Sequence, residues 1–363
     1  MIEVKHLQLD KTKRSIVISD IHANLQLFKK LLTKLQYTSE DYLFINGDLC
    51  EKGPASLEVV DYVRNMSEES TNVFITKGNC DVVFRYVYNG DEGIISYMDR
   101  RKDSILNEML SKCGKSLEDF ADLQELAHFY QHYFSEELDW LDALPAAFET
   151  DDFIIIHAGI EDIKDWQLTD EQFALSASAF YEKGHQANKT VIVGHWPVVN
   201  YRAKQISSHN PLIDLKKHMI ALDGGNQIKV DGQLNALIIE NGTYSYTYVD
   251  ELTHEMIVQQ DHVDPTERIG TVTYPNYQMK IIEQGEFFTL CENSNLGIQQ
   301  WIKNEYLLVE DGQPYCKDDL SITFLSVEKG ESVFIVDDTC EGYTLIKRNN
   351  GEVGWIPAYC LSS

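Results

Sequence analysis

The chain carries little positive charge for its size. It has 31 lysines and arginines against 58 aspartates and glutamates in 363 residues, a formal net charge of −27 at pH 7. Proteins that bind nucleic acid over a broad surface use such cations to neutralise phosphates. The charge balance therefore disfavours general nucleic acid binding, although a local basic pocket is compatible with it.

Paired cysteines and long apolar runs are also missing. Seven cysteines are spread from Cys50 to Cys360 without paired spacing, which favours free thiols in a reducing compartment over a disulfide framework. No apolar run reaches the length of a membrane span, and residues 1–6 lack the apolar core of a secretory signal. We therefore expect a cytoplasmic protein without membrane contact, built from two or three globular domains.

Five short apolar runs are each followed at once by side chains that can bind a metal ion. Runs of this kind are typical of strands buried on both faces, and they cover residues 15–18, 42–45, 73–76, 153–156 and 190–193. The motifs that follow them are Ser19-Asp20-Ile21-His22, Gly47-Asp48, Gly78-Asn79-Cys80-Asp81, His157-Ala158-Gly159 and Gly194-His195. Because open α/β sheets place their sites beyond the carboxyl ends of strands, we expect these side chains to converge.

The spacing of apolar residues predicts how the runs are connected. Residues 23–35 and 54–66 have helical periodicity, so strand, helix, strand, helix, strand is the expected order through Asn79, with a parallel sheet. From about residue 82 to 145 the pattern is long, helical and polar, which predicts a helical insertion. Such an insertion either only covers the sheet, the alternative we favour here, or forms a lid that shapes substrate access.

The remaining chain is predicted to be rich in strands. An Asn241-Gly242 step marks a hairpin at the end of a first domain, residues 1–252, and a polar linker follows over 253–268. Residues 269–363 show a faint repeat, about 270–311 and 318–363, in which each unit has short alternating strands and a late Trp-Ile. These units resemble the bacterial Src-homology-type small β-barrel, and their tryptophans are either core residues or the lining of a groove for a peptide partner.

The motif side chains suit two adjacent divalent ions. Such a site needs one carboxylate between the ions, with imidazole and oxygen ligands around it. Asp48 is the candidate bridge. Asp20 and His22 would complete one ion's ligands, and the other ion would take Asn79, His157 and His195.

The order of these five motifs resembles the calcineurin-like metallophosphoesterases, over roughly residues 14–250. Residues 47–53 and 141–145 are most similar to the branch that holds serine/threonine protein phosphatases and symmetrical diadenosine tetraphosphate hydrolases, including bacterial members. The resemblance implies a four-layer αββα sandwich and a metal-dependent phosphoester hydrolase with two ions, Mn, Fe or Zn. The implied substrate is a phosphorylated small molecule or a phosphoprotein.

Several positions depart from the pattern of that branch. Cys80 stands where the phosphatases have a histidine that protonates the leaving group, and a thiol is a weaker acid for that role. Glu51-Lys52 replaces Asp-Arg and gives up the two-pronged grip of a guanidinium on phosphate. The candidate catalytic residues are therefore Cys80, Asp81, Lys52 and Glu51. Asp223, in Asp-Gly-Gly, is expected behind the ligands, where it orients a metal-bound histidine.

These departures leave a second hypothesis open. The chain could be a metal-binding adaptor with weak or no catalysis that recruits partners through its C-terminal barrels. The complete set of metal ligands favours the enzyme.

Overall fold

A computed structural model describes residues 1–362, which form two compact units. The first holds residues 1–196, 211–228 and 232–250, and the second holds residues 197–210, 229–231 and the chain from 251 onward. In the described part of the chain, none of the helices combines the length and the apolar composition that crossing a bilayer requires. All seven cysteines are free thiols.

One sheet of the first unit contains three of the five predicted strands. Its order is β11-β10-β2-β3-β4, and β2, β3 and β4 are parallel. Helices α1 (Leu25–Lys34) and α2 (Ser56–Glu69) connect these three strands, as predicted. The strands are β2 (Ser15–Ile18), β3 (Tyr42–Asn46), β4 (Val73–Thr76), β10 (Gln233–Glu240) and β11 (Thr243–Asp250), the last two forming the predicted hairpin.

The other two predicted strands belong to a second sheet, β1-β5-β6-β7-β9-β8, in which β6, β7 and β9 are parallel. Its strands are β1 (Val4–His6), β5 (Ala147–Glu149), β6 (Phe153–Ile156), β7 (Thr190–Val193), β8 (Leu212–Asp214) and β9 (Met219–Ala221).

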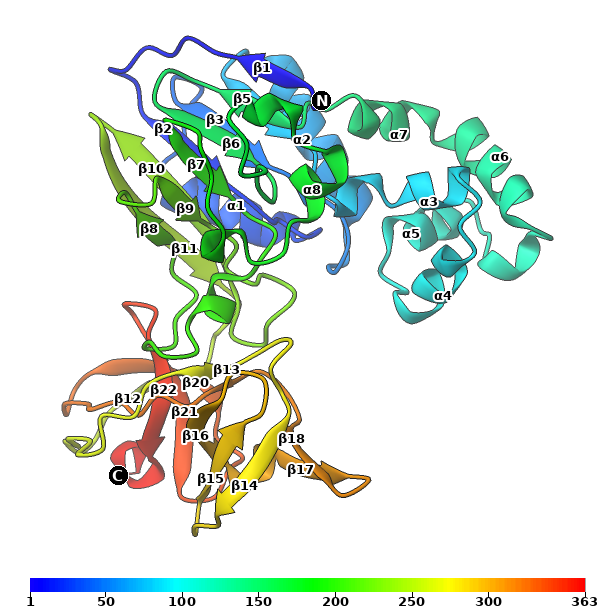
Figure 1. The fold of residues 1–363 in the computed structure, drawn as a ribbon. Helices are drawn as coiled ribbons and strands as arrows, with labels where there is room; N and C mark the ends of the chain where they lie inside the picture. The colour runs from blue at the N-terminus through cyan, green and yellow to red at the C-terminus, as the bar shows by residue number, and fades with distance from the viewer. Residues whose placement is uncertain (363) are drawn as a thin grey trace. The chain divides into compact units, whose positions relative to one another are not determined.

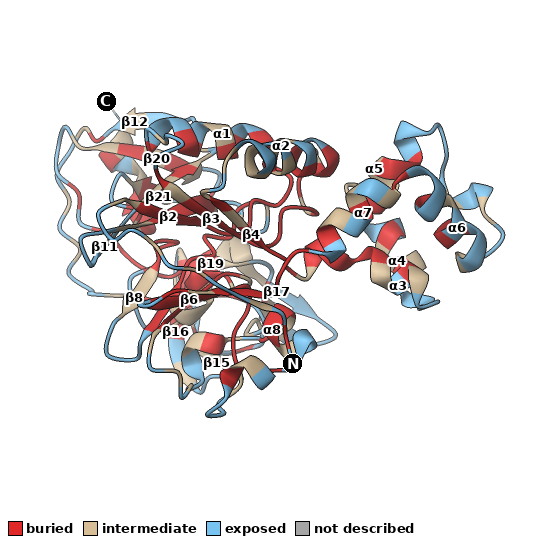
Figure 2. Ribbon diagram, turned by 90° about the horizontal axis from the view of Figure 1, so that it is seen from above, coloured by how far each residue is buried: buried red, intermediate tan, exposed pale blue. Residues whose placement is uncertain are grey.

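The two sheets pack face to face through a buried aromatic layer. The Phe44 ring of β3 lies 4.9 Å from the Phe74 ring and 5.9 Å from the Phe153 ring, centroid to centroid. Helices α1 and α2 cover the outer face of the first sheet, and α8 (Glu171–Ser176) lies beside the second (Figure 2). This is the predicted αββα order, and it brings the carboxyl ends of β2, β3, β4, β6 and β7 to one edge of the sandwich.

The predicted helical insertion is present and stands to one side of the two sheets (Figures 1 and 2). Its core is apolar, with Met98, Leu106 and Tyr130 fully buried. A hydrogen bond from Leu57 N of α2 to the Glu108 carboxylate joins the insertion to the sandwich. Its helices are α3 (Phe84–Tyr88), α4 (Gly93–Arg100), α5 (Ile105–Lys112), α6 (Leu123–Tyr133) and α7 (Ser135–Asp142).

The second unit consists of small antiparallel sheets. Two three-stranded meanders, β14-β15-β16 and β20-β21-β22, are each followed by a short 3₁₀ helix, at Asn304–Tyr306 and Ala358–Leu361. Strand β12 (Glu255–Ile257) lies in the stretch expected as a linker and pairs with β20. The other strands are β13 (Thr271–Val272), β14 (Met279–Glu283), β15 (Phe288–Asn293), β16 (Ile298–Lys303), β17 (Leu307–Glu310), β18 (Gln313–Cys316), β19 (Leu320–Ser321), β20 (Ser332–Asp337), β21 (Tyr343–Arg348) and β22 (Val353–Pro357).

The two tryptophans of the repeats differ in their surroundings. Trp355 is a core residue, and its indole N–H donates to Ser321 O at 2.7 Å. Trp301 is half-buried, with the Arg268 guanidinium 4.0 Å from its ring centroid. The resemblance of this unit to Src-homology-type barrels, and its peptide partner, stay predictions.

Candidate metal centre

The loops that leave β2, β3 and β7 bend sharply at the predicted ligands. Asp20, His22, Asp48 and His195 all have left-handed backbone conformations, with φ of 59°, 47°, 50° and 64°. In residues with a Cβ atom this conformation raises the conformational free energy by about 1 kcal/mol or more each. Such residues therefore occur mainly where function requires them. Four strained ligands in three separate loops therefore mark this edge of the sandwich as a functional site.

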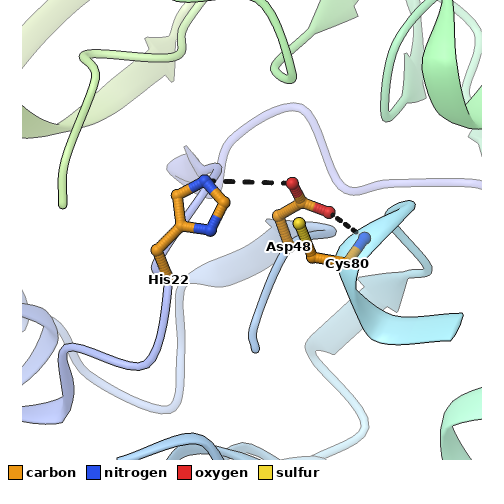
Figure 3. Close-up of side chains that lie close together, drawn as sticks. All are labelled: His22, Asp48 and Cys80. Atoms are coloured by element: carbon orange, nitrogen blue, oxygen red, sulfur yellow. Dashed lines mark hydrogen bonds and ion pairs between the residues drawn. The ribbon is translucent and has the colours of Figure 1, made fainter. Parts of the chain in front are cut away.

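His22 and two carboxylates form one half of the cluster. His22 Nε2 lies 3.9 Å from Asp20 Oδ1. It lies 3.8 Å from Asp48 Oδ2 (Figure 3). The other ring nitrogen, Nδ1, lies 3.3 Å from Cys50 O. Burial lowers the pKa of His22 to about 4, so the ring is neutral, and its single proton belongs on Nδ1, facing that carbonyl.

His22 Nε2 consequently carries a lone pair, is buried, and faces the carboxylates of Asp20 and Asp48. It has no hydrogen-bond partner among the described residues. Acceptor atoms that face one another across nearly 4 Å are unfavourable unless a cation lies between them. These three side chains fit one divalent ion.

The other half of the cluster lies around His157. Its Nε2 is 3.3 Å from Asp48 Oδ1, and its Nδ1 is 2.9 Å from Asn46 O. The Asn79 amide oxygen lies 3.2 Å from His157 Nε2 and 2.8 Å from His195 Nδ1. If the Asn79 amide were turned over, its nitrogen would donate hydrogen bonds to these two histidine nitrogens. The oxygen is therefore preferred in this position only when a cation lies between it and the histidines.

Asp48 is thus shared by both halves, with one carboxylate oxygen towards His22 and the other towards His157. The Asp48 carboxylate raises the pKa of His157 to about 10 against the opposing effect of burial. A proton and a metal ion therefore compete for the same position on His157 Nε2. This arrangement is what a carboxylate bridging two ions requires, and the residues present fit the implied pair of metals.

His195 and Asp223 both relate to Asp20. His195 N lies 3.1 Å from each carboxylate oxygen of Asp20 and donates to them. Asp223 accepts a hydrogen bond from Gly225 N at 2.7 Å, and the pKa of Asp20 is raised first by burial and then by the charge of Asp223. Asp223 is therefore placed behind Asp20. Its expected role in orienting a histidine stays a prediction.

The carboxylates of Asp81 and Glu51 accept hydrogen bonds from backbone amides around the cluster of candidate ligands. Asp81 accepts from Leu49 N and Gly78 N, both at 2.7 Å, and so ties the Asp48 loop to the Asn79 loop. Glu51 accepts from Ile105 N at 2.8 Å and from the Tyr97 hydroxyl, both in the insertion. Their contacts are those of positioning residues, in contrast to the catalytic roles expected from the motif.

Lys52 and Cys80 line a cavity next to Asn79. The Lys52 ammonium has no ion-pair partner among the described residues, which suits it to hold an anion. Burial raises the pKa of the Cys80 thiol well above its usual range, and the Asp48 carboxylate raises it further. Cys80 N also donates to Asp48 Oδ1 at 2.8 Å. Without a metal ion the thiol is a weak proton donor.

Sequence reasoning missed three polar residues that support the ligands. Asn46 is fully buried, donates from its side chain to Ile156 O at 3.0 Å and accepts from the Thr76 hydroxyl at 2.8 Å, so it bridges the two sheets. The Ser19 hydroxyl lies 2.5 Å from Asp20 Oδ2, and the Asn226 amide donates to Ile21 O at 2.7 Å. The only available signal was a polar residue at the end of an apolar run, as Asn46 is after Ile45.

Replacing Asn46 with alanine is expected to lower the free energy of unfolding by about 2–4 kcal/mol, because it leaves Ile156 O and the Thr76 hydroxyl unsatisfied and opens a small cavity. Urea unfolding measures the loss. Asn72→Ala, which removes a bond from a half-buried amide to Ser39 O, is the matched control and should cost about 1 kcal/mol or less. Equal losses in the two variants would contradict the bridging role of Asn46.

Another cavity, of about 480 Å³, lies elsewhere in the first unit. It is lined by residues at the amino ends of β2 and β6 and at the β10–β11 turn, including Ser15, Phe153 and Asn241. Since the predicted ligands lie at the carboxyl ends of the same strands, this cavity is separate from the metal centre.

Comparison with known proteins places the chain among phosphoesterases. A bis(5'-nucleosyl)-tetraphosphatase (symmetrical) of Buchnera aphidicola is 38% identical over 95 residues, which are 26% of this chain and 31% of that protein. The asymmetrical bis(5'-nucleosyl)-tetraphosphatase PrpE of Bacillus subtilis is 24% identical over 208 residues, covering 50% of this chain and 78% of PrpE. The chain thus spans about a third of the length of the first of these relatives.

A solved structure assigned as a diadenosine tetraphosphatase aligns with 69% of this chain and 100% of its own, at 18% identity and a TM-score of 0.47. The family model for calcineurin-like phosphoesterases matches residues 13–222, more than half of the chain and all five ligand motifs. This protein is a member of the calcineurin-like phosphoesterase family.

Proposed function

We propose that the chain hydrolyses phosphoester or phosphoanhydride bonds with two divalent ions bound by Asp20, His22, Asp48, Asn79, His157 and His195. One observation carries the proposal: the two oxygens of Asp48 each face a different buried histidine, at 3.8 Å from His22 Nε2 and 3.3 Å from His157 Nε2. A carboxylate whose two oxygens face separate histidines is the arrangement expected of a ligand that bridges two ions.

The chemistry of the ligands limits which metal ions suit this site. Imidazole combined with carboxylate and amide oxygens favours Mn, Fe or Zn over Ca. When bound, two such ions polarise the phosphoryl oxygens and lower the pKa of the attacking water. The chain would hold the ions at fixed positions, because hydrogen bonds of Asp81, Asn46 and Asn226 tie together the segments that carry the candidate ligands.

Lys52 and Cys80 bear on the class of substrate. Lys52, unpaired beside the cluster, would hold a phosphoryl oxygen by charge. Cys80 supplies only a weak acid for the leaving group, and loss of a positioned general acid costs about 10²–10⁴-fold with poor leaving groups. A substrate whose leaving group is itself a phosphate needs little protonation. We therefore propose a dinucleoside polyphosphate, in keeping with the names of the relatives, rather than an alkyl phosphomonoester.

Removal and return of metal tests the enzymatic proposal against the adaptor alternative. The chain treated with EDTA is expected to lose hydrolysis of diadenosine tetraphosphate and of bis-p-nitrophenyl phosphate, and to regain it with Mn²⁺, Fe²⁺ or Zn²⁺ at two ions per chain. Product release and bound metal are measured on the same sample. Two bound ions without any turnover would reject hydrolysis and support an adaptor.

A further inference from the structure

A cavity of about 310 Å³ within the first unit opens beside the candidate metal ligands. Its lining includes Asn79, Cys80 and Lys52. Most of the remaining wall comes from the insertion, chiefly α3 and α4. The insertion therefore borders the place where a substrate would lie, which favours the alternative that it shapes substrate access over the expectation that it only covers the sheet.

Side chains of opposite charge line this cavity. Lys52 lines it together with the candidate ligand Asn79, and its positive charge is among the causes, after burial, that lower the pKa of His22 and of His195. Asp91 lines the cavity from the turn before α4, where its carboxylate accepts from Gly93 N at 2.8 Å. In the described part of the chain Asp91 has no basic partner. An anion is therefore accepted near Lys52 and repelled near Asp91.

The rest of the lining is largely apolar and aromatic. Val83 and Ile94 are buried, and Tyr97 is held in place by its hydrogen bond to Glu51. Tyr86 of α3, although it lines the cavity, is 46% exposed. A large aromatic side chain left open in a cavity wall offers a flat surface on which another ring can stack.

We infer that this cavity binds one nucleoside of the substrate, with its base stacked on Tyr86 and an exocyclic amino group of the base donating to Asp91. The inference rests on the proposed function, which places the reacting phosphoryl group at Asn79 and Lys52. A volume of about 310 Å³ is at the lower end for small-molecule sites, so the cavity holds one nucleoside and not two. Bases with an amino group, such as adenine, are preferred to uracil.

Calorimetric titration of the Mn²⁺-loaded protein with adenosine monophosphate, uridine monophosphate and inorganic phosphate tests the inference without turnover. Adenosine monophosphate is expected to bind about tenfold more tightly than uridine monophosphate, because adenine offers the carboxylate an exocyclic amino group, whereas uracil has only an N3–H flanked by two carbonyl oxygens that the carboxylate repels. Tyr86→Ala should weaken the binding of adenosine monophosphate about tenfold and leave phosphate unchanged, and Tyr86→Phe should restore it. Asp91→Asn should bring the two nucleotides towards equal affinity.

Tyr133→Ala is the matched control, since Tyr133 is a tyrosine of the same insertion, 58% exposed, that does not line the cavity. Equal binding of the three probes by the unmodified protein, or equal losses in Tyr86→Ala and Tyr133→Ala, would overturn the inference. Turnover without a preference for the base would reject the inference and leave the hydrolase standing. Selective nucleotide binding without turnover would support the nucleoside site and reject the hydrolase. Tighter binding of a phosphoserine peptide than of either nucleotide would overturn the inference and assign the cavity to a phosphoprotein.

Discussion

Asp48→Asn is expected to lower kcat/KM for diadenosine tetraphosphate by about 10³-fold and to reduce the bound metal below two ions per chain. The physical reason is that an amide offers one weak neutral oxygen where the carboxylate presents a charged oxygen to each half of the cluster. Metal ions stabilise the transition state by several kcal/mol, and about 4 kcal/mol corresponds to about 10³-fold in rate. Steady-state kinetics and metal analysis of the same preparation measure both effects.

Asp41→Asn is the control for removing a buried carboxylate as such. Asp41 is 8% exposed and pairs with Arg14 at 2.7 Å, away from every ligand motif. This variant should lose stability and keep both its two ions and its kcat/KM. If Asp48→Asn keeps full activity with two bound ions, Asp48 is no bridge and the metal assignment is wrong.

Gly194→Ala is the second change with a large expected effect. A Cβ atom at residue 194 would lie 1.9 Å from Ser19 Oγ and 2.2 Å from Asp20 Oδ2, far inside contact distance. The loop that carries His195 must then move away from Asp20, breaking the bonds from His195 N to both Asp20 oxygens. We expect a loss of about 2–4 kcal/mol in the free energy of unfolding and at least a tenfold weaker binding of the metal.

Gly184→Ala makes the same chemical change where space is free, since its Cβ would meet only Asp162 Oδ2, at 4.0 Å. Thermal unfolding with and without Mn²⁺ measures stability and metal binding together, because a bound ligand raises the midpoint temperature. Gly184→Ala should keep the metal-dependent rise in midpoint, and Gly194→Ala should lose most of it. A normal rise in Gly194→Ala would show that the Asp20 and His195 loops need not approach so closely.

Local pattern predicted the strands and the candidate ligands, because each ligand follows a buried strand within a few residues. Asp20 and His22 after β2, and Asp48 after β3, could be identified from runs of apolar residues alone. The roles of Glu51 and Asp81 could not be identified in this way. The sequence of a motif is the same whether its carboxylate faces the substrate or accepts hydrogen bonds from the backbone. Their partners, Ile105 N and Gly78 N, became visible only in the folded chain.

The supporting and substrate-facing residues depend on contacts between distant parts of the chain. Asn46 reaches Ile156 across 110 positions, and Asn226 reaches Ile21 across 205. Tyr86 and Asp91 looked like ordinary polar positions of an insertion, and only the packing of α3 and α4 put them in the wall of a cavity beside Asn79. Nothing in their neighbours along the chain distinguishes them from Tyr133.

The sequence by itself determined the family, the order of strands and helices through Asn79, and the candidate ligands for two metal ions. These properties follow from local periodicity and from ligand types at strand ends, which short segments already contain. Only the tertiary structure decided that the two oxygens of Asp48 face different histidines, that Glu51 and Asp81 brace loops, and that the insertion lines a cavity. Those outcomes depend on which distant segments of the chain come into contact. Such contacts are decided by burial and hydrogen bonding in the complete fold, and a short segment does not contain that information.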